Sequence, residues 1–114
     1  MLRKKEEVKI ERIDACHDGK GIVECLPMLS SNDSQRGIMF LHDDIIPPNT
    51  SIGEHLHAND EEVYYLIEGE CTLIYDGKEM PMKTGDVSVV QSGHSHGLIN
   101  EGNKNARLIV FGVK

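Results

Sequence analysis

Residues 51–67 read SIGEHLHANDEEVYYLI, and this stretch decides both the fold and the chemistry that the chain can support. His55 and His57 are two residues apart, so an extended strand would place both imidazoles on the same face. The Asn59-Asp60 pair predicts a tight turn, which would return the next strand beside the first with Glu62 on it. Two imidazoles and a carboxylate at this spacing indicate a partial ligand set for a divalent transition metal.

One more histidine completes the predicted ligand set. His96 lies far along the chain, after a second stretch punctuated by Gly85 and Gly93. Only a fold that closes on itself could bring it to the other three side chains. Three imidazoles and one carboxylate on a metal that accepts five or six ligands would leave one or two positions open for water or substrate.

The spacing resembles the first sequence motif of the cupin family. That motif runs Gly, five residues, His-x-His, three or four residues, Glu, six residues, Gly. Residues 49–69 fit it at His55, His57, Glu62 and Gly69. Asn49 stands at the opening glycine position, where Asn tolerates a left-handed backbone better than most residues. Glu61 would satisfy the shorter spacing, but only Glu62 is also in register with Gly69.

The second cupin motif runs Gly, five residues, Pro-x-Gly, two residues, His, three residues, Asn. Residues 85–100 match it at Gly85, Gly93, His96 and Asn100, with Gln91 in place of the proline. The resemblance implies a jelly-roll β-barrel in a single domain, residues 1–114. It also implies one divalent metal ion (Mn, Fe, Zn or Ni) bound by His55, His57, Glu62 and His96.

Patterning outside the motifs independently predicts an all-β sandwich or barrel. Short segments with alternating or continuous apolar residues are separated by turn residues every ten or so positions, and no long segment repeats apolar residues at helical spacing. The Asp76-Gly77 pair predicts a hairpin turn. The expected strands include 8–13, 22–26 ending at Pro27, 37–42, 62–67, 71–75, 87–90 and 106–111.

Composition and net charge indicate which binding partners and which cellular location to expect. The formal net charge of −7 and the pI near 5.3 argue against nucleic acid and anionic membranes, because phosphate groups require a basic surface. No apolar run approaches the ~18 residues of a membrane span. The first residues lack the apolar core of a signal peptide, so a cytoplasmic location is expected.

Several reactive residue types are interpreted as structural. Cys16, Cys25 and Cys71 have irregular spacing and read as small hydrophobic residues rather than disulfide partners. His17 and His42 lack partners at useful spacing and are expected to be surface or packing residues. The Asp43-Asp44 pair predicts a solvated turn.

Two residues are candidate catalytic groups. Tyr64 should share the inward face of its strand with Glu62, whereas Tyr65 should face the other way. A buried tyrosine usually packs with its hydroxyl satisfied, but a phenol near a metal could act as an acid or anchor a substrate. His94 lies two residues from His96 and could assist from outside the ligand set.

Two functions of different class remain open at this stage. The first is a metal-dependent enzyme (isomerase, lyase or decarboxylase, or oxygenase) acting on a small oxygen-rich metabolite such as a sugar or carboxylate. The second is a non-catalytic module in which the same barrel binds a small ligand or the metal. The scarcity of arginine argues against a phosphorylated substrate. A homodimer is expected, with the strand at 8–13 a candidate for pairing across the interface.

Overall fold

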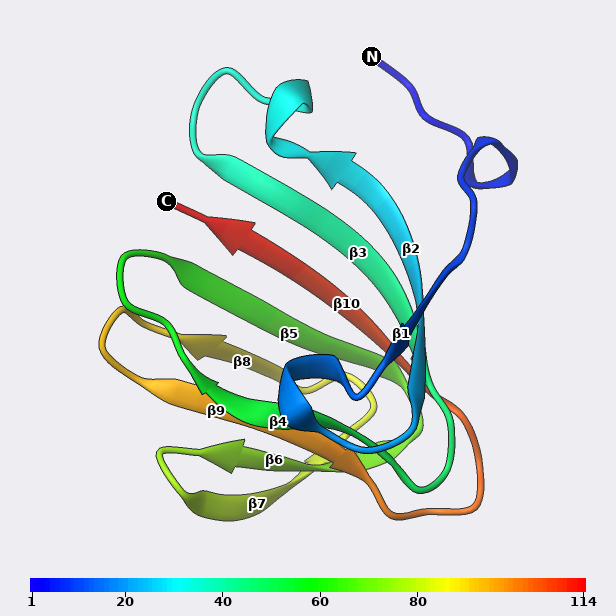
Figure 1. Ribbon diagram of the computed structural model, residues 1–114, viewed down its shortest axis with the longest axis vertical. Coiled ribbons are helices and arrows are strands. Elements are labelled where there is room, and N and C mark those ends of the chain that lie inside the picture. Colours follow the sequence, from blue (N-terminus) through cyan, green and yellow to red (C-terminus); the bar gives the residue numbers. More distant parts are fainter.

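The computed structural model describes residues 1–114 and confirms the all-β class. It contains ten strands and three single turns of 3-10 helix (Figure 1). The strands are β1 (Glu11–Asp14), β2 (Ile22–Ser30), β3 (Ile38–Ile46), β4 (Thr50–Leu56), β5 (Glu61–Glu68), β6 (Glu70–Tyr75), β7 (Lys78–Lys83), β8 (Val87–Val90), β9 (Ser95–Asn100) and β10 (Ala106–Val113). The helical turns are η1 (Lys5–Glu7), η2 (Cys16–Asp18) and η3 (Ser31–Asp33).

The strands form two antiparallel sheets that face each other. One sheet has the order β1-β2-β3-β10-β5-β8, and the other has the order β4-β9-β6-β7. Figure 1 shows the long, curved larger sheet above the smaller one, with the chain crossing between them at both ends. Each sheet turns one face inward, because side chains alternate between the two faces of a strand.

The interior is filled by the alternate residues of the inward faces. On β5 these are Glu62, Tyr64 and Leu66, which are 7%, 1% and 0% exposed, as predicted from the alternation. Tyr65 points outward and is 43% exposed. The apolar core comprises Val23, Ile46, Ile52, Tyr64, Leu66, Cys71, Leu73, Met82, Leu98, Ala106, Leu108 and Val110.

Three sequence-based strand boundaries are wrong. The sequence predicts the first strand at residues 8–13, but β1 begins only at Glu11, so residues 8–10 lie outside it. β2 continues through Pro27, because the pairing with β3 shifts register between Pro27 and Leu29 and the proline sits at that irregularity. The Asp43-Asp44 pair is no solvated turn, since β3 runs through both residues to Ile46.

The two aspartates on β3 face opposite sides of the sheet. Asp43 points outward and accepts two hydrogen bonds from the Arg107 guanidinium, at 2.6 and 2.9 Å. Asp44 points inward and is only 6% exposed. A sequence of two adjacent acidic residues suggests solvent exposure, but strand alternation buries one of them here.

The predicted hairpin between the histidine strand and the Glu62 strand is also wrong. β4 pairs with β9, whereas β5 pairs with β10 and β8 in the other sheet. The turn after His57 therefore carries the chain across the barrel instead of folding it back alongside. Glu62 consequently faces the histidines across the interior.

The turn residues of the two motifs have identifiable structural roles. Asn49 adopts a left-handed conformation with φ of 58°, which explains why Asn can replace Gly there. Asp76 and Gly77 both have positive φ, as the predicted hairpin turn requires. Asn100 is buried, and its amide donates to the carbonyl oxygens of Ile46 and Lys104, each at 2.8 Å. It thereby ties the end of β9 to the end of β3.

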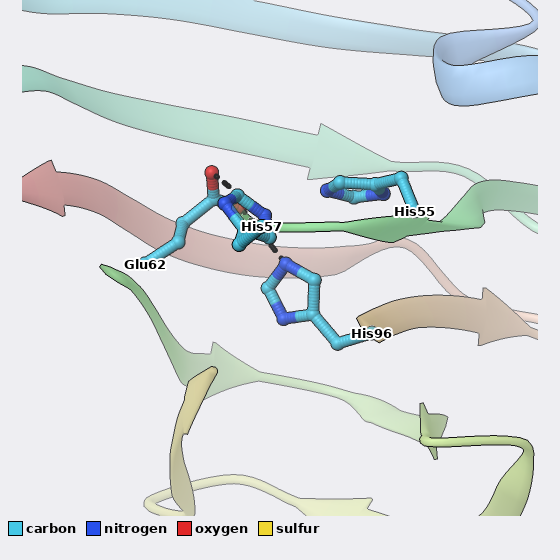
Figure 2. A group of neighbouring side chains, drawn as sticks. All are labelled: His55, His57, Glu62 and His96. Atoms are coloured by element: carbon cyan, nitrogen blue, oxygen red, sulfur yellow. Dashed lines mark hydrogen bonds and ion pairs between the residues drawn. The ribbon is translucent and has the colours of Figure 1, made fainter. Parts of the chain in front are cut away.

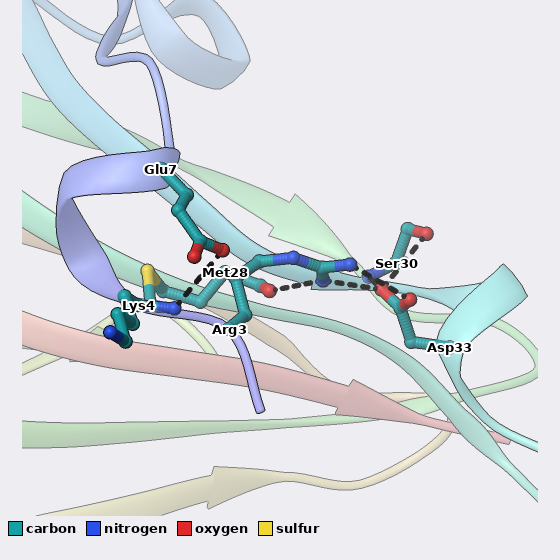
Figure 3. A network of polar contacts seen from close by, with 6 residues as sticks. All are labelled: Arg3, Lys4, Glu7, Met28, Ser30 and Asp33. Atoms are coloured by element: carbon teal, nitrogen blue, oxygen red, sulfur yellow. Dashed lines mark hydrogen bonds and ion pairs between the residues drawn. The ribbon is translucent and has the colours of Figure 1, made fainter. Parts of the chain in front are cut away.

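The N-terminal segment is attached to the larger sheet by Arg3 (Figure 3). Its guanidinium donates to both carboxylate oxygens of Asp33, at 2.8 and 3.2 Å, and to the carbonyl oxygen of Met28 at 2.8 Å. Asp33 also accepts a bond from the backbone N–H of Ser30. This pairing lowers the pKa of Asp33 to about 2. None of the helical turns has the length or apolar character needed to cross a membrane.

Candidate metal centre

The four predicted ligand residues meet inside the barrel. One ligand atom from each of His55, His57, Glu62 and His96 lies within 4.8 Å of the others. The three imidazole centroids are 4.8–4.9 Å apart. Figure 2 shows the three rings and the carboxylate turned toward one common point. The Glu62 oxygens lie 3.2 Å from His96 Nε2 and 3.7 Å from His57 Nε2.

Strand register explains the convergence. His55 and His96 are direct cross-strand partners in the β4–β9 pair, so their side chains are neighbours on one face. His57 lies just beyond β4, and its backbone N–H donates to the backbone carbonyl oxygen of His94 at 3.0 Å. Glu62 extends from β5 in the opposite sheet. The histidines thus come from one sheet and the carboxylate from the other.

Backbone and side-chain acceptors orient two of the imidazoles. The Nδ1–H of His55 donates to the Gly53 carbonyl oxygen at 2.7 Å. The Nδ1–H of His57 donates to the Asp60 carboxylate at 3.1 Å. A hydrogen bond at Nδ1 fixes the tautomer that leaves the Nε2 lone pair available. Both Nε2 atoms therefore face the centre of the cluster as acceptors.

These residues fit a divalent transition metal. The Nε2 atoms of His55 and His57 are buried and have no hydrogen-bond partner in the protein. Burial lowers the pKa of His55 to about 4, so its imidazole is neutral at physiological pH. Neutral imidazole nitrogens and one carboxylate are borderline donors that suit such an ion. The cluster could hold a metal.

Tyr64 lies beside the cluster, stacked on His96. The two rings have centroids 4.0 Å apart and planes inclined by 15°. The Tyr64 hydroxyl is buried and has no hydrogen-bond partner in the protein. Burial raises the pKa of Tyr64 well above its usual value, so the phenol stays protonated and its O–H is available as a donor.

His94 has a different environment. Its Nδ1–H donates to the Asp76 carboxylate at 2.6 Å, and both side chains are nearly half exposed. Asp76 also accepts the backbone N–H of Ser95, and both bonds lower its pKa. The His94 side chain is thus tied to the β6–β7 hairpin, while its backbone carbonyl braces His57.

A small cavity opens beside Glu62 and Tyr64. Its volume is about 140 Å³, enough to hold several water molecules. No Lys or Arg contributes to its walls, so neither Arg107 nor Arg36 reaches it. The lining residues are Ile13, Cys16, His17, Phe40, His42, Asp44, Ile52, Glu62, Tyr64 and Val110.

Sequence reasoning missed three residues that surround the site. His17 is exposed, as expected, but its ring stacks on His55. Asp60 orients His57, and its place three residues after that histidine is a signal that could have been used. Asp44 lines the cavity, and burial raises its pKa to about 7. No spacing rule connects His17 or Asp44 with the motif.

The chain belongs to the cupin family. Residues 44–112 match the family described as Cupin domain. This match covers both motifs and every residue of the metal-ligand cluster. The predicted resemblance and the jelly-roll barrel are therefore confirmed.

Individual relatives agree with this assignment. The chain is 34% identical over 109 residues to the "Oxalate-binding protein" of Thermotoga maritima, a match that covers 96% of this chain and 90% of the relative. A crystal structure of a "predicted oxalate decarboxylase" from Thermotoga maritima has a TM-score of 0.94 at 33% identity, covering 99% and 98% of the two chains. The polyketide cyclase RemF from Streptomyces resistomycificus shares the fold, with a TM-score of 0.80 at 21% identity over 99% and 80% of the chains.

Proposed function

We propose that this protein is a metal-dependent enzyme of the lyase/decarboxylase class that acts on a small dicarboxylate of the oxalate type. The observation that carries the proposal is the convergence of three histidines with Glu62, which also lines a small cavity. One divalent ion (Mn, Fe, Zn or Ni) would be held by His55, His57, Glu62 and His96. With four protein ligands, at least one position would be open to the substrate.

Cavity size and the relatives support a small ligand such as oxalate. The volume of about 140 Å³ suits a molecule of a few heavy atoms and is small for a sugar phosphate. A phosphorylated substrate would also need cationic side chains, and the walls contain no Lys or Arg. The similarity to proteins described as oxalate-binding and as a predicted oxalate decarboxylase favours the same ligand class.

The side chains around the cavity can assist this reaction. The bound ion would supply Lewis acidity and would orient the carboxylate oxygens. Cleavage of the carbon–carbon bond of oxalate releases carbon dioxide, and the electron pair left on the other carbon takes a proton to give formate. No oxidant is needed. Tyr64 is the candidate donor of that proton, because its hydroxyl is buried in the cavity wall and stays protonated.

The test measures binding and turnover separately. Protein loaded with Mn²⁺ should bind oxalate, seen by calorimetry, and should release formate, detected by NMR. A His55→Ala, His57→Ala double variant should lose metal and both activities. Tyr64→Phe should retain metal and oxalate binding but lose most formate release. If the metal-loaded protein neither binds nor converts oxalate, the proposed substrate class is wrong.

The second candidate is a non-catalytic oxalate-binding module. The stacking of Tyr64 on His96 favours it, because this contact gives the tyrosine a purely structural reason to be present. Binding of oxalate with no formate release by the metal-loaded protein would select this candidate. In that case Tyr64→Phe should change neither metal binding nor oxalate binding.

His94 is the second proposed catalytic residue. Its pairing with Asp76 gives an exposed dyad that could exchange protons with solvent. His94→Ala should leave metal content nearly unchanged and lower formate release. Asp76→Asn is the matched variant, since it keeps the imidazole but removes its anionic partner. Unchanged turnover in both variants would exclude a catalytic role for His94.

We further propose that the chain forms a homodimer. β1 is an edge strand of the larger sheet, and an unpaired edge favours pairing with another chain. Light scattering at micromolar concentration should report twice the mass of one chain. A monomer under those conditions would contradict this proposal.

A further inference from the structure

A second group of metal-binding residue types lies in the larger sheet, apart from the four ligands described above. Cys25, His42 and Asp44 place one ligand atom each within 4.8 Å of one another. Cys25 on β2 and Asp44 on β3 are direct cross-strand partners. His42 is two residues before Asp44 on β3, so all three side chains share the inward face. The geometry points to a second metal site, formed by Cys25, His42 and Asp44, for a divalent transition ion of the zinc class.

The first argument is the buried carboxyl group of Asp44. The residue is only 6% exposed, and its Oδ1 atom has no hydrogen-bond partner in the protein. A buried carboxylate is costly unless it is paired or coordinates a metal. The Asp44 carboxyl group lies beside a thiol and an imidazole, and its Oδ1 atom is free to bind a cation.

No Lys or Arg side chain lines the cavity beside Asp44. On the inward face Asp44 is flanked by Cys25 on one side and by Leu108 of β10 on the other. The neighbouring Val110 is apolar as well. Arg107 lies on the outer face, where it is paired with Asp43. A bound divalent ion would supply the missing positive charge.

The second argument is the donor set. A thiolate, an imidazole and a carboxylate together match the ligands that zinc takes in proteins. The thiolate also separates this site from the first, because soft sulfur ligands favour Zn²⁺ or Co²⁺ over Mn²⁺. The two clusters are therefore expected to differ in the metal that they prefer.

The third argument is access. His42 and Asp44 both line the cavity of about 140 Å³ that also contacts Glu62. Three protein ligands leave the fourth position of a tetrahedral ion open, as in catalytic zinc sites. An ion at this site would face the cavity from β3, and β10 separates β3 from β5, which carries Glu62 and Tyr64.

Titration of metal-free protein with Co²⁺ tests the proposal, because a cobalt–thiolate bond adds a charge-transfer absorption in the near ultraviolet. The wild-type protein should bind two equivalents and show this band. A His57→Ala, His96→Ala variant, which disrupts the first cluster, should bind one equivalent and keep the band. This result would hold whether or not the protein acts on oxalate.

Variants of the second cluster give the reciprocal result. Cys25→Ser should lower the stoichiometry from two equivalents to one and abolish the band. Asp44→Asn should weaken binding of the second equivalent at least tenfold. Cys71→Ser is the matched control, since Cys71 is also buried but belongs to neither cluster. This variant should keep both the stoichiometry of two equivalents and the band. Saturation of the wild type by one equivalent without a thiolate band would overturn the proposal, as would a band that survives Cys25→Ser.

Discussion

The ring of His17 stacks on the ring of His55, with centroids 3.6 Å apart and planes inclined by 11°. His17 belongs to η2, in which His17 and Asp18 have positive φ, as does Ala15 just before the turn. Such conformations are unfavourable for non-glycine residues and persist where the surroundings enforce them. Here the turn is held against β4, so the N-terminal part of the chain covers His55, one of the candidate metal ligands.

The stack predicts that His17 supports metal binding without being a ligand. His17→Ala should release the His55 ring and weaken metal affinity by about tenfold, the lower end of the effect seen for outer-shell residues. His17→Phe keeps an aromatic ring over His55 and should retain near wild-type affinity. Competition with a chelator measures both variants. Equal losses in the two variants would show that a polar contact of His17 matters rather than the stack.

Close backbone packing of η2 on β4 predicts a strong requirement for glycine at position 53. A Cβ added to Gly53 would overlap the carbonyl oxygen of His17, and backbone atoms on both sides cannot move aside easily. Gly53→Ala should therefore lower the free energy of unfolding by about 1–3 kcal/mol, the usual cost of overpacking. Urea denaturation provides the measurement.

A matched control exists in the same protein. A Cβ on Gly37 would meet the backbone oxygen and nitrogen of Lys114 at 3.4 and 3.8 Å, which are ordinary contacts. Gly37→Ala should leave stability unchanged or raise it slightly, because alanine restricts the unfolded chain. If both variants lose the same stability, the packing of η2 on β4 is not the reason that position 53 requires glycine.

The ligand residues could be predicted from sequence because local spacing determines them. His55 and His57 share a face through strand alternation alone, and the motif spacing selects Glu62 over Glu61. The course of the chain after the turn between His57 and Glu62 is harder to predict from sequence. Asn59 and Asp60 indicate a turn, but a turn signal does not say whether the chain pairs with the preceding strand or crosses to another sheet.

The residues that sequence reasoning misread are those whose position depends on long-range pairing. Asp44 looks solvated beside Asp43, and only the register with Cys25 and Leu108 shows that it is buried. His17 has no local partner, and its contact with His55 arises from packing of η2 on β4. Sequence spacing carries no information on either contact.

The Arg3–Asp33 pair predicts an acid-dependent contribution to stability. The folded-state pKa of Asp33, about 2, lies below its ordinary value of 3.8, because the carboxylate accepts bonds from Arg3 and Ser30. The contribution is therefore fully present above about pH 4 and is lost as the pH falls through about 2. Asp33→Asn should be less stable than wild type at pH 7, and the difference should shrink as the pH falls from about 4 to 2.

Thermal unfolding across this pH range measures the effect. Asp14→Asn is the control, since Asp14 is exposed and forms no ion pair in the structure. Its difference from wild type should not follow the same pH profile. High salt should reduce the Asp33 effect, because the pair is partly exposed. A difference that is constant from pH 7 to pH 2 would contradict the assignment.

Glu62 should be the most sensitive ligand position, because it supplies the only anionic donor of the first cluster. Glu62→Gln keeps the size of the side chain but removes the charge that attracts the ion. We expect metal affinity to fall by more than the roughly 10–100-fold that follows loss of an outer-shell partner. The barrel should stay folded, since the amide can still contact His96, and circular dichroism should show an unchanged β spectrum.

Glu61→Gln is the matched control, because Glu61 precedes Glu62 on β5 and faces the other side of the sheet. Metal content measured after dialysis should fall in Glu62→Gln and stay at the wild-type level in Glu61→Gln. Full occupancy in Glu62→Gln would mean that the histidines alone hold the ion and that the carboxylate serves another purpose.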